Sequence, residues 1–257
     1  MQSDFNGKVV LVTGATSGIG HAAAIRFAEG GARLALVGRN RDALEDALQK
    51  VREAGGDGIP LEADLSDDNE TKRLVTKTLQ AYGRLDVLVN AAGHISSGTI
   101  EDTTLSAWDA MMNINLRAVF CLMQEAAPPL IESGGNIVNV SSVTGLRSFP
   151  GVLAYCVSKA AVDQLTRCAA LELAAKGVRV NAVNPGVVVT QIHKRGGMDE
   201  EQYAAFLERS KQTHPIGRVG QAREVAELIF YLASDKAGWI TGATYSIDGG
   251  RAQTCAR

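Results

Sequence analysis

The chain has 257 residues, of which 46% are hydrophobic and 21% charged, an ordinary globular composition that excludes disorder and coiled coils. The formal net charge is -2 and there is no basic block, so we expect neither nucleic acid nor an anionic membrane as a partner. The apolar runs are far shorter than the roughly 18 residues that a membrane span needs. A chain of this length suits one α/β domain, and we expect residues 1–257 to form it.

The chain ends and the cysteines favour a cytoplasmic protein. Residues 1–7 are polar and an apolar run follows at once, so no signal or transit peptide is expected. Residues 254–257 form neither a peroxisomal address nor a prenylation box. The four cysteines show no metal-type spacing, three of them lie in apolar helical patterns, and we interpret them as reduced core thiols without a metal site. They are Cys121, Cys156, Cys168 and Cys255.

Apolar runs and helical patterns alternate along the whole chain. In chain order the expected elements are strand 8–13, helix 18–30, strand 33–37, helix 41–54, strand 58–63, helix 67–82, strand 86–90, helix 105–131, strand 136–141, helix 154–176, strand 178–184, helix 224–233 and strand 244–247. We expect Ser66 or Asp67 to cap the third helix, Pro128 and Pro129 to interrupt the fourth near its end, and 186–220 to be less regular. The alternation predicts an α/β fold: a single-domain, Rossmann-type, doubly wound parallel sheet of about seven strands with helices on both faces.

A glycine-rich turn joins the first strand to the first helix. Residues 13–20 read Thr-Gly-Ala-Thr-Ser-Gly-Ile-Gly, with the spacing Gly-x-x-x-Gly-x-Gly. Glycines at such a turn let the backbone approach a pyrophosphate, and the helix N-terminus offers free N–H groups to it. A tight turn between strand and helix also needs glycine for its conformation alone. We predict dinucleotide binding, with cofactor contacts at Gly14, Thr16, Ser17, Gly18, Ile19 and Gly20.

The end of the second strand points to the cofactor type. A fold that prefers NAD carries Asp or Glu there to bind the ribose 2′-hydroxyl, whereas residues 38–40 read Gly-Arg-Asn. Arg39 suits a 2′-phosphate, so NADP(H) is favoured over NAD(H), with Asn40 beside it. Alternatively, Arg39 covers the adenine ring or faces solvent. Asp64 and Leu65, after the third strand, are expected either to contact adenine or to cap a helix.

Tyr155 and Lys159 stand four residues apart, so on a helix they share one face. A phenol is a weak base at pH 7, and we expect the lysine cation one turn away to lower its pKa toward the range useful for proton transfer. By themselves the two residues are equally compatible with a solvated pair on a surface helix. Their meaning therefore depends on the other motifs.

Together these motifs resemble the short-chain dehydrogenases/reductases over essentially the whole chain, and most closely the oxoacyl-carrier-protein reductase-like members. Besides the glycine turn and the Tyr-x-x-x-Lys pair, the resemblance rests on Asn-Ala-Ala-Gly at 90–93, Asn115, Ser142, Pro-Gly at 185–186, Ile-Thr-Gly at 240–242 and Ile-Asp-Gly-Gly at 247–250.

The resemblance implies a catalytic tetrad of Asn115, Ser142, Tyr155 and Lys159. Tyr155 would exchange a proton with the substrate oxygen, Ser142 would hold that oxygen, and Lys159 would lower the Tyr155 pKa and bind the nicotinamide ribose. Asn115 would anchor a water that links Lys159 to solvent. The further cofactor contacts that the resemblance implies are Asn90, Ala91, Gly93, Tyr155, Lys159, Pro185, Gly186, Val188 and Thr190.

Several of these residues have ordinary structural alternatives. Asn115 fits a buried, satisfied amide, Ser142 fits turn chemistry at a strand end, and Thr190 fits a helix cap. His94 and His193 are each compatible with substrate contact or with a structural role.

Residues 187–214 correspond to the substrate lid in the family and are rich in charge. Gly196 and Gly197, followed by acidic residues, indicate a hinge and a helix start.

The sequence thus predicts an NAD(P)-dependent oxidoreductase that transfers hydride between the nicotinamide and a small carbonyl or secondary alcohol substrate. The alternative is a catalytically silent dinucleotide-binding sensor or scaffold. The resemblance further implies a homotetramer, packed through the helix before the fifth strand and the Tyr155 helix. Substrate identity and reaction direction stay open, because fold analogy does not fix specificity.

Overall fold

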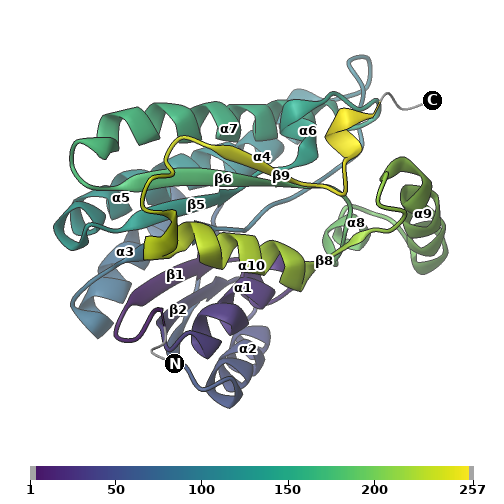
Figure 1. Ribbon diagram of the computed structural model, residues 1–257. Helices are drawn as coiled ribbons and strands as arrows, with labels where there is room; N and C mark the ends of the chain where they lie inside the picture. The colour runs from purple at the N-terminus through teal and green to yellow at the C-terminus, as the bar shows by residue number, and fades with distance from the viewer. Residues whose placement is uncertain (1–3, 255–257) are drawn as a thin grey trace.

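A seven-stranded, fully parallel sheet forms the centre of the protein in a computed structural model that describes residues 4–254 (Figure 1). The strand order is β3-β2-β1-β4-β5-β6-β9. The strands are β1 (Val9–Thr13), β2 (Arg33–Gly38), β3 (Asp57–Glu62), β4 (Val87–Asn90), β5 (Asn136–Val140), β6 (Arg179–Pro185) and β9 (Thr244–Ile247). The doubly wound parallel sheet predicted from the sequence is confirmed.

Helices cover both faces of the sheet. One layer contains α1 (Gly18–Glu29), α2 (Arg41–Glu53) and α10 (Ala222–Ala233), and the other contains α3 (Asp68–Tyr82), α4 (Leu105–Met112), α5 (Ala118–Ser133) and α7 (Leu153–Ala174). The β1 side chains alternate between them: Val10 and Val12 belong to the core under α1, whereas Val9 and Leu11 belong to the core under α5. Because both faces are covered, the strand reads as one continuous apolar run.

The order of the strands creates the site. Chain order reverses between β1 and β4, so the connections after these strands leave toward opposite faces of the sheet. In open α/β sheets, ligands bind at such a reversal, beyond the carboxyl ends of the strands. The glycine turn after β1 and the Asn-Ala-Ala-Gly segment after β4 both lie there.

The predicted helix 105–131 is present but is interrupted elsewhere than expected. A π-helical turn, η1 (Asn113–Arg117), separates α4 from α5, whereas Pro128 and Pro129 lie inside α5. The prolines remove the partners of the carbonyls four residues earlier, on Gln124 and Glu125. Gln124 is exposed and Glu125 half-buried, so water can reach these carbonyls and the helix continues.

The segment predicted to be less regular contains short elements. They are β7 (Val188–Val189), α8 (Ile192–Arg195), α9 (Glu200–Thr213) and β8 (Gly220–Gln221). Asp199 and Gln202 form a capping box at the start of α9, which confirms the predicted helix start. Two further short helices border the site, α6 (Val143–Leu146) and η3 (Arg251–Gln253).

The remaining element boundaries agree with the sequence within two residues, the usual uncertainty at such ends. Asp67 rather than Ser66 caps α3, since its carboxylate accepts from the N–H of Asn69 at 2.7 Å. Cys121 is buried, but Cys168 is exposed on α7, so its interpretation as a core thiol was wrong. Cys255 lies outside the described residues.

Candidate active site

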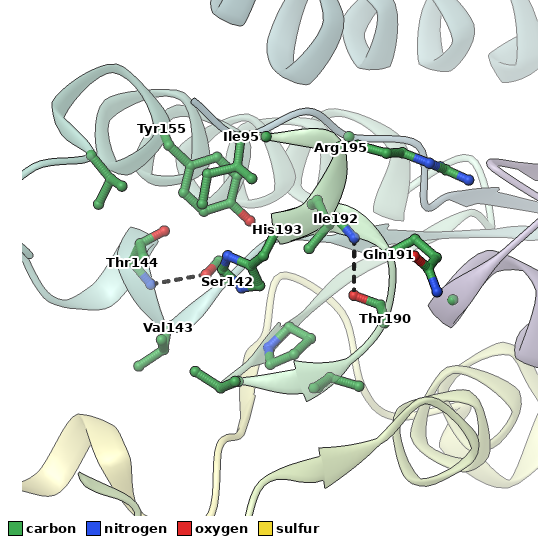
Figure 2. Close-up of a pocket in the computed structure, with 18 of the residues that line it drawn as sticks. Ile95, Ser142, Val143, Thr144, Tyr155, Thr190, Gln191, Ile192, His193 and Arg195 are labelled. Carbon is green, nitrogen blue, oxygen red and sulfur yellow. Dashed lines mark hydrogen bonds between the residues drawn. The ribbon is translucent and has the colours of Figure 1, made fainter. Parts of the chain in front are cut away.

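A cavity of about 830 Å³ lies beyond the carboxyl ends of the strands (Figure 2). Its walls come from the turns after β1, β4, β5 and β6, from α8 and α9, and from the start of η3. It is large enough for an extended ligand together with a second small molecule.

The glycine turn forms one wall of this cavity and fits a dinucleotide. Gly14 and Gly18 have φ of +67° and +57°, a region that favours glycine. A Cβ at Gly20 would lie 2.5 Å from the Gly14 carbonyl oxygen, so the start of α1 could not otherwise approach the turn. The Ser17 side chain makes no capping hydrogen bond. The first N–H groups of α1 are therefore not capped by that side chain and suit an anionic diphosphate. Of the predicted contacts in the turn, the cavity is lined by Gly14, Ser17, Gly18 and Ile19.

The residues predicted at the adenosine end lie outside the cavity wall, at the ends of β2 and β3. Arg39 is exposed, and Asn40 caps α2 by accepting from the Ala43 N–H at 2.8 Å. Asp64 caps no helix, because its carboxylate accepts from the Ser66 N–H at 2.9 Å in a local turn. That hydrogen bond, and secondarily the Arg39 cation, lowers the Asp64 pKa. Leu65 is buried in the core.

His94 lies close enough to Arg39 to be affected by its charge. Burial, followed by the nearby Arg39 cation, lowers its pKa. It is not part of the cavity wall, so the structure gives no support to substrate contact by His94.

The Asn-Ala-Ala-Gly segment is joined to the glycine turn, since the Thr13 hydroxyl accepts from the N–H groups of Ala91 and Ala92, both at 3.0 Å. Ala91 and Gly93 line the cavity as predicted contacts. Asn90 does not: its side chain is buried and donates to Asn139 on β5 at 2.9 Å. Its observed role is to link β4 to β5.

The residues after β6 line the opposite wall. Pro185, Gly186, Val188 and Thr190, for which the sequence predicted cofactor contacts, all line the cavity. A Cβ at Gly18 would lie 3.1 Å from the Thr190 side chain, so the α1 start and this segment approach each other across the site. Thr190 does not cap α8, whose N-cap is Gln191.

Ser142 and Tyr155 meet at the base of the cavity. Ser142 is the N-cap of α6, and its Oγ accepts from the Thr144 N–H at 3.1 Å. The Tyr155 hydroxyl points toward Ser142 (Figure 2). Both residues are 8% exposed. Burial raises the pKa of Tyr155 to about 12, and the hydrogen bond from Ser142 opposes this rise.

Lys159 lies behind Tyr155, one turn along α7. Its Nζ donates to the Val140 carbonyl at 2.8 Å and lies 5.7 Å from the centre of the Tyr155 ring. Burial lowers the pKa of Lys159 to about 8. The expected lowering of the Tyr155 pKa is not found here, because the loss of hydration outweighs the attraction of a cation at this distance. Tyr155 is therefore a protonated phenol at neutral pH.

Asn115 is fully buried in the π-helical turn. Its amide accepts from the His94 N–H at 2.8 Å and donates to the His94 carbonyl at 2.9 Å, so it clamps the backbone after β4. A Cβ at Gly93 would lie 3.6 Å from the Asn115 Oδ1 and 3.7 Å from the Lys159 Nζ. Asn115 and Lys159 thus flank the same glycine.

Sequence reasoning missed a pair of polar side chains beneath these residues. The Asn184 amide donates to the Ser142 carbonyl at 2.9 Å and to the Asp163 carboxylate at 2.8 Å. Asp163 stands four residues after Lys159 on α7, and burial raises its pKa. The available signals were an Asn inside a buried strand and an Asp at helical spacing from Lys159, but neither revealed its partner.

His193, left open by the sequence, lines the cavity. Its ring packs on Phe206 with centroids 4.5 Å apart, and burial lowers its pKa. In Figure 2 its ring extends from α8 toward the side of the site where Ser142 lies.

Within residues 4–254, no three His, Cys, Asp or Glu side chains gather as a metal site would require. Over the same residues, no helix combines the length and apolar character needed to cross a bilayer.

Known proteins with similar sequence and structure identify the family. A family model described as "Enoyl-(Acyl carrier protein) reductase" matches residues 14–252. The chain is 41% identical over 249 residues to a glucose 1-dehydrogenase of Gluconobacter oxydans, covering 96% of this chain and 92% of the relative. It is 39% identical over 245 residues to a 3-oxoacyl-(acyl-carrier-protein) reductase of Thermotoga maritima, covering 95% and 97%. A solved short-chain dehydrogenase/reductase of Caenorhabditis elegans, with cofactor, superposes with a TM-score of 0.94 at 34% identity, covering 98% of both chains.

The fold and these relatives define an oxidoreductase that acts on alcohol and carbonyl groups with NAD(P). The chain belongs to the short-chain dehydrogenase/reductase family, as its motifs predicted.

Proposed function

We propose that this enzyme reduces a small ketone, or oxidises the matching secondary alcohol, through Asn115, Ser142, Tyr155 and Lys159, with NADP(H) preferred. The observation that carries the proposal is the meeting of the Ser142 and Tyr155 hydroxyls at the cavity base, with the Lys159 Nζ behind them and the glycine turn on an adjoining wall. The nicotinamide, when bound, supplies or accepts the hydride.

In reduction, the substrate oxygen accepts hydrogen bonds from Ser142 and Tyr155. As negative charge develops on that oxygen, Tyr155 gives it the phenolic proton. With a pKa of about 12, Tyr155 is protonated beforehand, and Ser142 stabilises the developing charge. The resulting phenolate regains a proton from Lys159, whose pKa of about 8 makes its ammonium a ready donor. Lys159 then recovers a proton from solvent along the path beside Gly93 and Asn115.

The NADP(H) preference rests on Arg39. It lies at the end of β2, is exposed, and forms no ion pair within the described residues. A guanidinium in this place pairs with a 2′-phosphate better than with a 2′-hydroxyl. Replacing Arg39 by Asp should weaken NADPH binding and improve NADH binding, measured by nucleotide fluorescence titration. Unchanged NADPH affinity in Arg39→Asp would show that the preference is assigned wrongly.

We further propose that residues 187–214 act as a substrate lid, that the enzyme is a homotetramer, and that it works in the cytoplasm. The lid assignment is supported by the cavity-facing residues of α8 and α9. The tetramer is supported by exposed apolar side chains on the helices expected to pack, such as Phe120 on α5 and Leu171 on α7. Cys121, Cys156 and Cys168 are free thiols, which suits a reducing compartment.

The test combines a substrate panel with one variant. Purified enzyme with NADPH should reduce at least some members of a broad ketone panel. Tyr155→Phe should lose about 100- to 10,000-fold in kcat/KM while keeping NADPH affinity, because only the proton donor is removed. Full activity in Tyr155→Phe would refute the mechanism. Cofactor binding without turnover across the panel would favour the silent sensor or scaffold.

A further inference from the structure

The charge on the cavity wall is one-sided. Within residues 4–254, no Asp or Glu lines the cavity, whereas four cationic side chains do: Lys159, Arg195, Arg209 and Arg251. Lys159 belongs to the reaction centre. Arg195 points away from Tyr155, toward the side where Gln191 lies (Figure 2). The function proposed above therefore leaves Arg209 and Arg251 without a role.

Arg209 lies on the α9 face that borders the cavity. Gln202, Ala205, Phe206 and Arg209 all line the wall, and their spacing of three, one and three residues places them along one side of a helix. Thr213 follows Arg209 by one further turn. Arg209 makes no hydrogen bond or ion pair within residues 4–254, so no protein contact holds its guanidinium.

Arg251 reaches the same place from the other end of the chain. It begins η3, which packs against α6, the short helix that Ser142 caps. Its Nη1 donates to the Thr213 hydroxyl, and its guanidinium lies 4.8 Å from the centre of the Phe149 ring. Because Thr213 is one turn from Arg209, Arg251 contacts the same side of α9 that carries Arg209.

No carboxylate neutralises these two cations directly. Burial lowers the Arg251 pKa, and the nearby Asp248 opposes this lowering only in part. The two Asp248 oxygens accept instead from the N–H groups of Gly250 and Ala252, at 2.9 and 2.7 Å. Glu208, next to Arg209, pairs instead with Lys211. Arg251 is half-buried, whereas Arg209 is exposed on α9. The half-buried Arg251 guanidinium has no bonded counter-ion, and this costs free energy that an anionic ligand would offset.

The cofactor does not account for this pair. Its diphosphate is expected at the glycine turn and its 2′-phosphate at Arg39, which is not part of the cavity wall. The same part of the wall contains the apolar side chains of Phe149, Pro150 and Phe206, together with Gln202 and His193. This end of the cavity therefore lies on the substrate side.

We propose that the substrate carries an anionic group, a carboxylate or a phosphate, which Arg209 and Arg251 bind while its carbonyl or hydroxyl group meets Ser142 and Tyr155. The substrate class is then a keto acid with its hydroxy acid, or a phosphorylated hydroxy/keto compound. Two guanidinium forks suit either anion, and the aromatic walls suit an apolar body between the two groups. This inference rests on the function proposed above.

The test compares anionic ketones with neutral counterparts of the same skeleton. The carboxylate arm uses benzoylformate and levulinate against their methyl esters, and the phosphate arm uses dihydroxyacetone phosphate against dihydroxyacetone. Wild-type enzyme should show higher kcat/KM for the anion than for its neutral partner in at least one arm. The arm that responds identifies the anion. Equal or better turnover of the neutral partners in both arms would overturn the inference.

The variants are Arg209→Gln and Arg251→Gln, with Arg73→Gln as a matched control on the exposed side of α3. Each pocket variant should lower kcat/KM for the preferred anion by about 10- to 100-fold, as expected for the loss of a charge-assisted hydrogen bond. Turnover of the neutral partner should change little, and Arg73→Gln should match wild type. An equal loss on anionic and neutral substrates would overturn the inference.

Folding and the proposed function are checked separately. Arg251→Lys keeps the charge and should retain more anion preference than Arg251→Gln, with thermal unfolding followed for all variants. If Arg251→Gln fails to fold, Arg209→Gln alone decides, because its side chain has no protein partner to lose. Absence of turnover on every ketone, neutral or anionic, would refute the proposed function, whereas turnover without anion preference would refute only this inference.

Discussion

The two ends of the cavity are held in different ways. At the reaction end, Ser142, Tyr155 and Lys159 are at most 8% exposed and rest on the ends of β5 and α7, against the packed sheet. At the lid end, α8 and α9 join the body through a few specific contacts, such as the Arg251 Nη1 that donates to the Thr213 hydroxyl on α9. The groups proposed to move protons are placed by the core, whereas most of the cavity wall proposed to select the substrate, Arg251 excepted, is placed by residues 187–214. Changes at the first end should therefore affect kcat, and changes at the second should affect KM.

The largest effect should come from removing the buried lysine. We expect Lys159→Met to lower kcat/KM by about 100-fold or more, because Tyr155 loses its proton supply.

The same variant should be more stable at pH 7. Burial lowers the Lys159 pKa from 10.5 to about 8, and at about 1.4 kcal/mol per pKa unit this costs roughly 3 kcal/mol while the group is charged. The lost hydrogen bond to Val140 offsets about 1 kcal/mol, leaving a gain of about 2 kcal/mol.

The pH dependence of that gain has a definite sign. A lysine with a lowered folded pKa costs stability in full below pH 8, and the cost disappears as pH rises through the unfolded value of 10.5. The free energies of unfolding of wild type and Lys159→Met, measured with urea, should therefore converge near pH 10.5. Lys77→Met, on an exposed part of α3, is the control and should show no such trend. If the difference in unfolding free energy between the two proteins grew with pH, the lowered pKa of Lys159 would be contradicted.

A smaller effect at the same end concerns Asn184. We expect Asn184→Ala to cost about 2–3 kcal/mol of unfolding free energy, because the Ser142 carbonyl and the Asp163 carboxylate lose their shared donor in a buried place. Asn69→Ala, exposed on α3, should change stability by less than about 0.5 kcal/mol. Denaturant melts measure both. If Asn184→Ala were as stable as wild type, the network would not be what holds Ser142.

At the lid end we expect an effect on KM. The His214 Nδ1 lies 2.6 Å from the Ser210 carbonyl and its Nε2 accepts from the Val187 N–H at 3.0 Å, which assigns a neutral ring with the proton on Nδ1. His214→Leu removes the acceptor, so KM should rise several-fold, with kcat retained and a loss of about 1–2 kcal/mol in stability. Steady-state kinetics separate the two constants. A fall in kcat with unchanged KM would contradict the division between the two ends.

Acidification of the wild-type enzyme should have the same effect as His214→Leu, because protonation of His214 also removes the acceptor for the Val187 N–H. Burial, opposed by the Ser210 hydrogen bond and by Asp248 and aided by Arg251, lowers the His214 pKa. The stability that the neutral ring contributes is complete above the unfolded value of 6.5 and is lost as pH falls through the folded value. KM should therefore rise on acidification in wild type and less so in His214→Leu.

The smallest effect on the fold, and the clearest on assembly, is expected at the exposed apolar side chains. Leu171 is 84% exposed on α7 and Phe120 50% on α5. Leu171→Gln and Phe120→Gln should split the proposed tetramer, measured by light scattering, while changing subunit stability by less than about 0.5 kcal/mol. The control is Trp239, which is fully exposed and lies outside both α5 and α7. If Trp239→Gln dissociated the tetramer while Leu171→Gln and Phe120→Gln did not, the interface would not lie on α5 and α7.

Much of the fold was predictable because each strand carries its own signal. An apolar run such as residues 9–13, followed by glycines, is interpretable without its neighbours. The π-helical turn was not, since residues 113–117 continue the helical pattern and a one-residue bulge leaves no compositional trace. The prolines misled us for the opposite reason: their signal is strong, but the solvent access that makes them tolerable is a tertiary property.

The site residues that belong to short sequence motifs were predictable. Burial, and contacts between residues far apart in the sequence, were less so. Ser142, Tyr155 and Lys159 do meet, but the direction of the Tyr155 pKa depends on burial, which the sequence does not display. Asn90 was predicted to contact the cofactor, and the sequence did not show that its side chain also binds Asn139 on the neighbouring strand β5. Arg209 and Arg251 are 42 positions apart in the chain, and only the folded structure brings both to one wall.

The hydrogen bond between Val187 and His214 closes residues 187–214 into a loop whose two ends meet at one point of the body. Such a loop is an exchangeable unit, because a different segment with the same closing contact would leave the sheet undisturbed. Grafting this stretch from a relative should transfer the lid's share of substrate preference, while Arg251, outside the loop, stays with the recipient. Within this architecture, new specificities can arise without altering the residues that move protons.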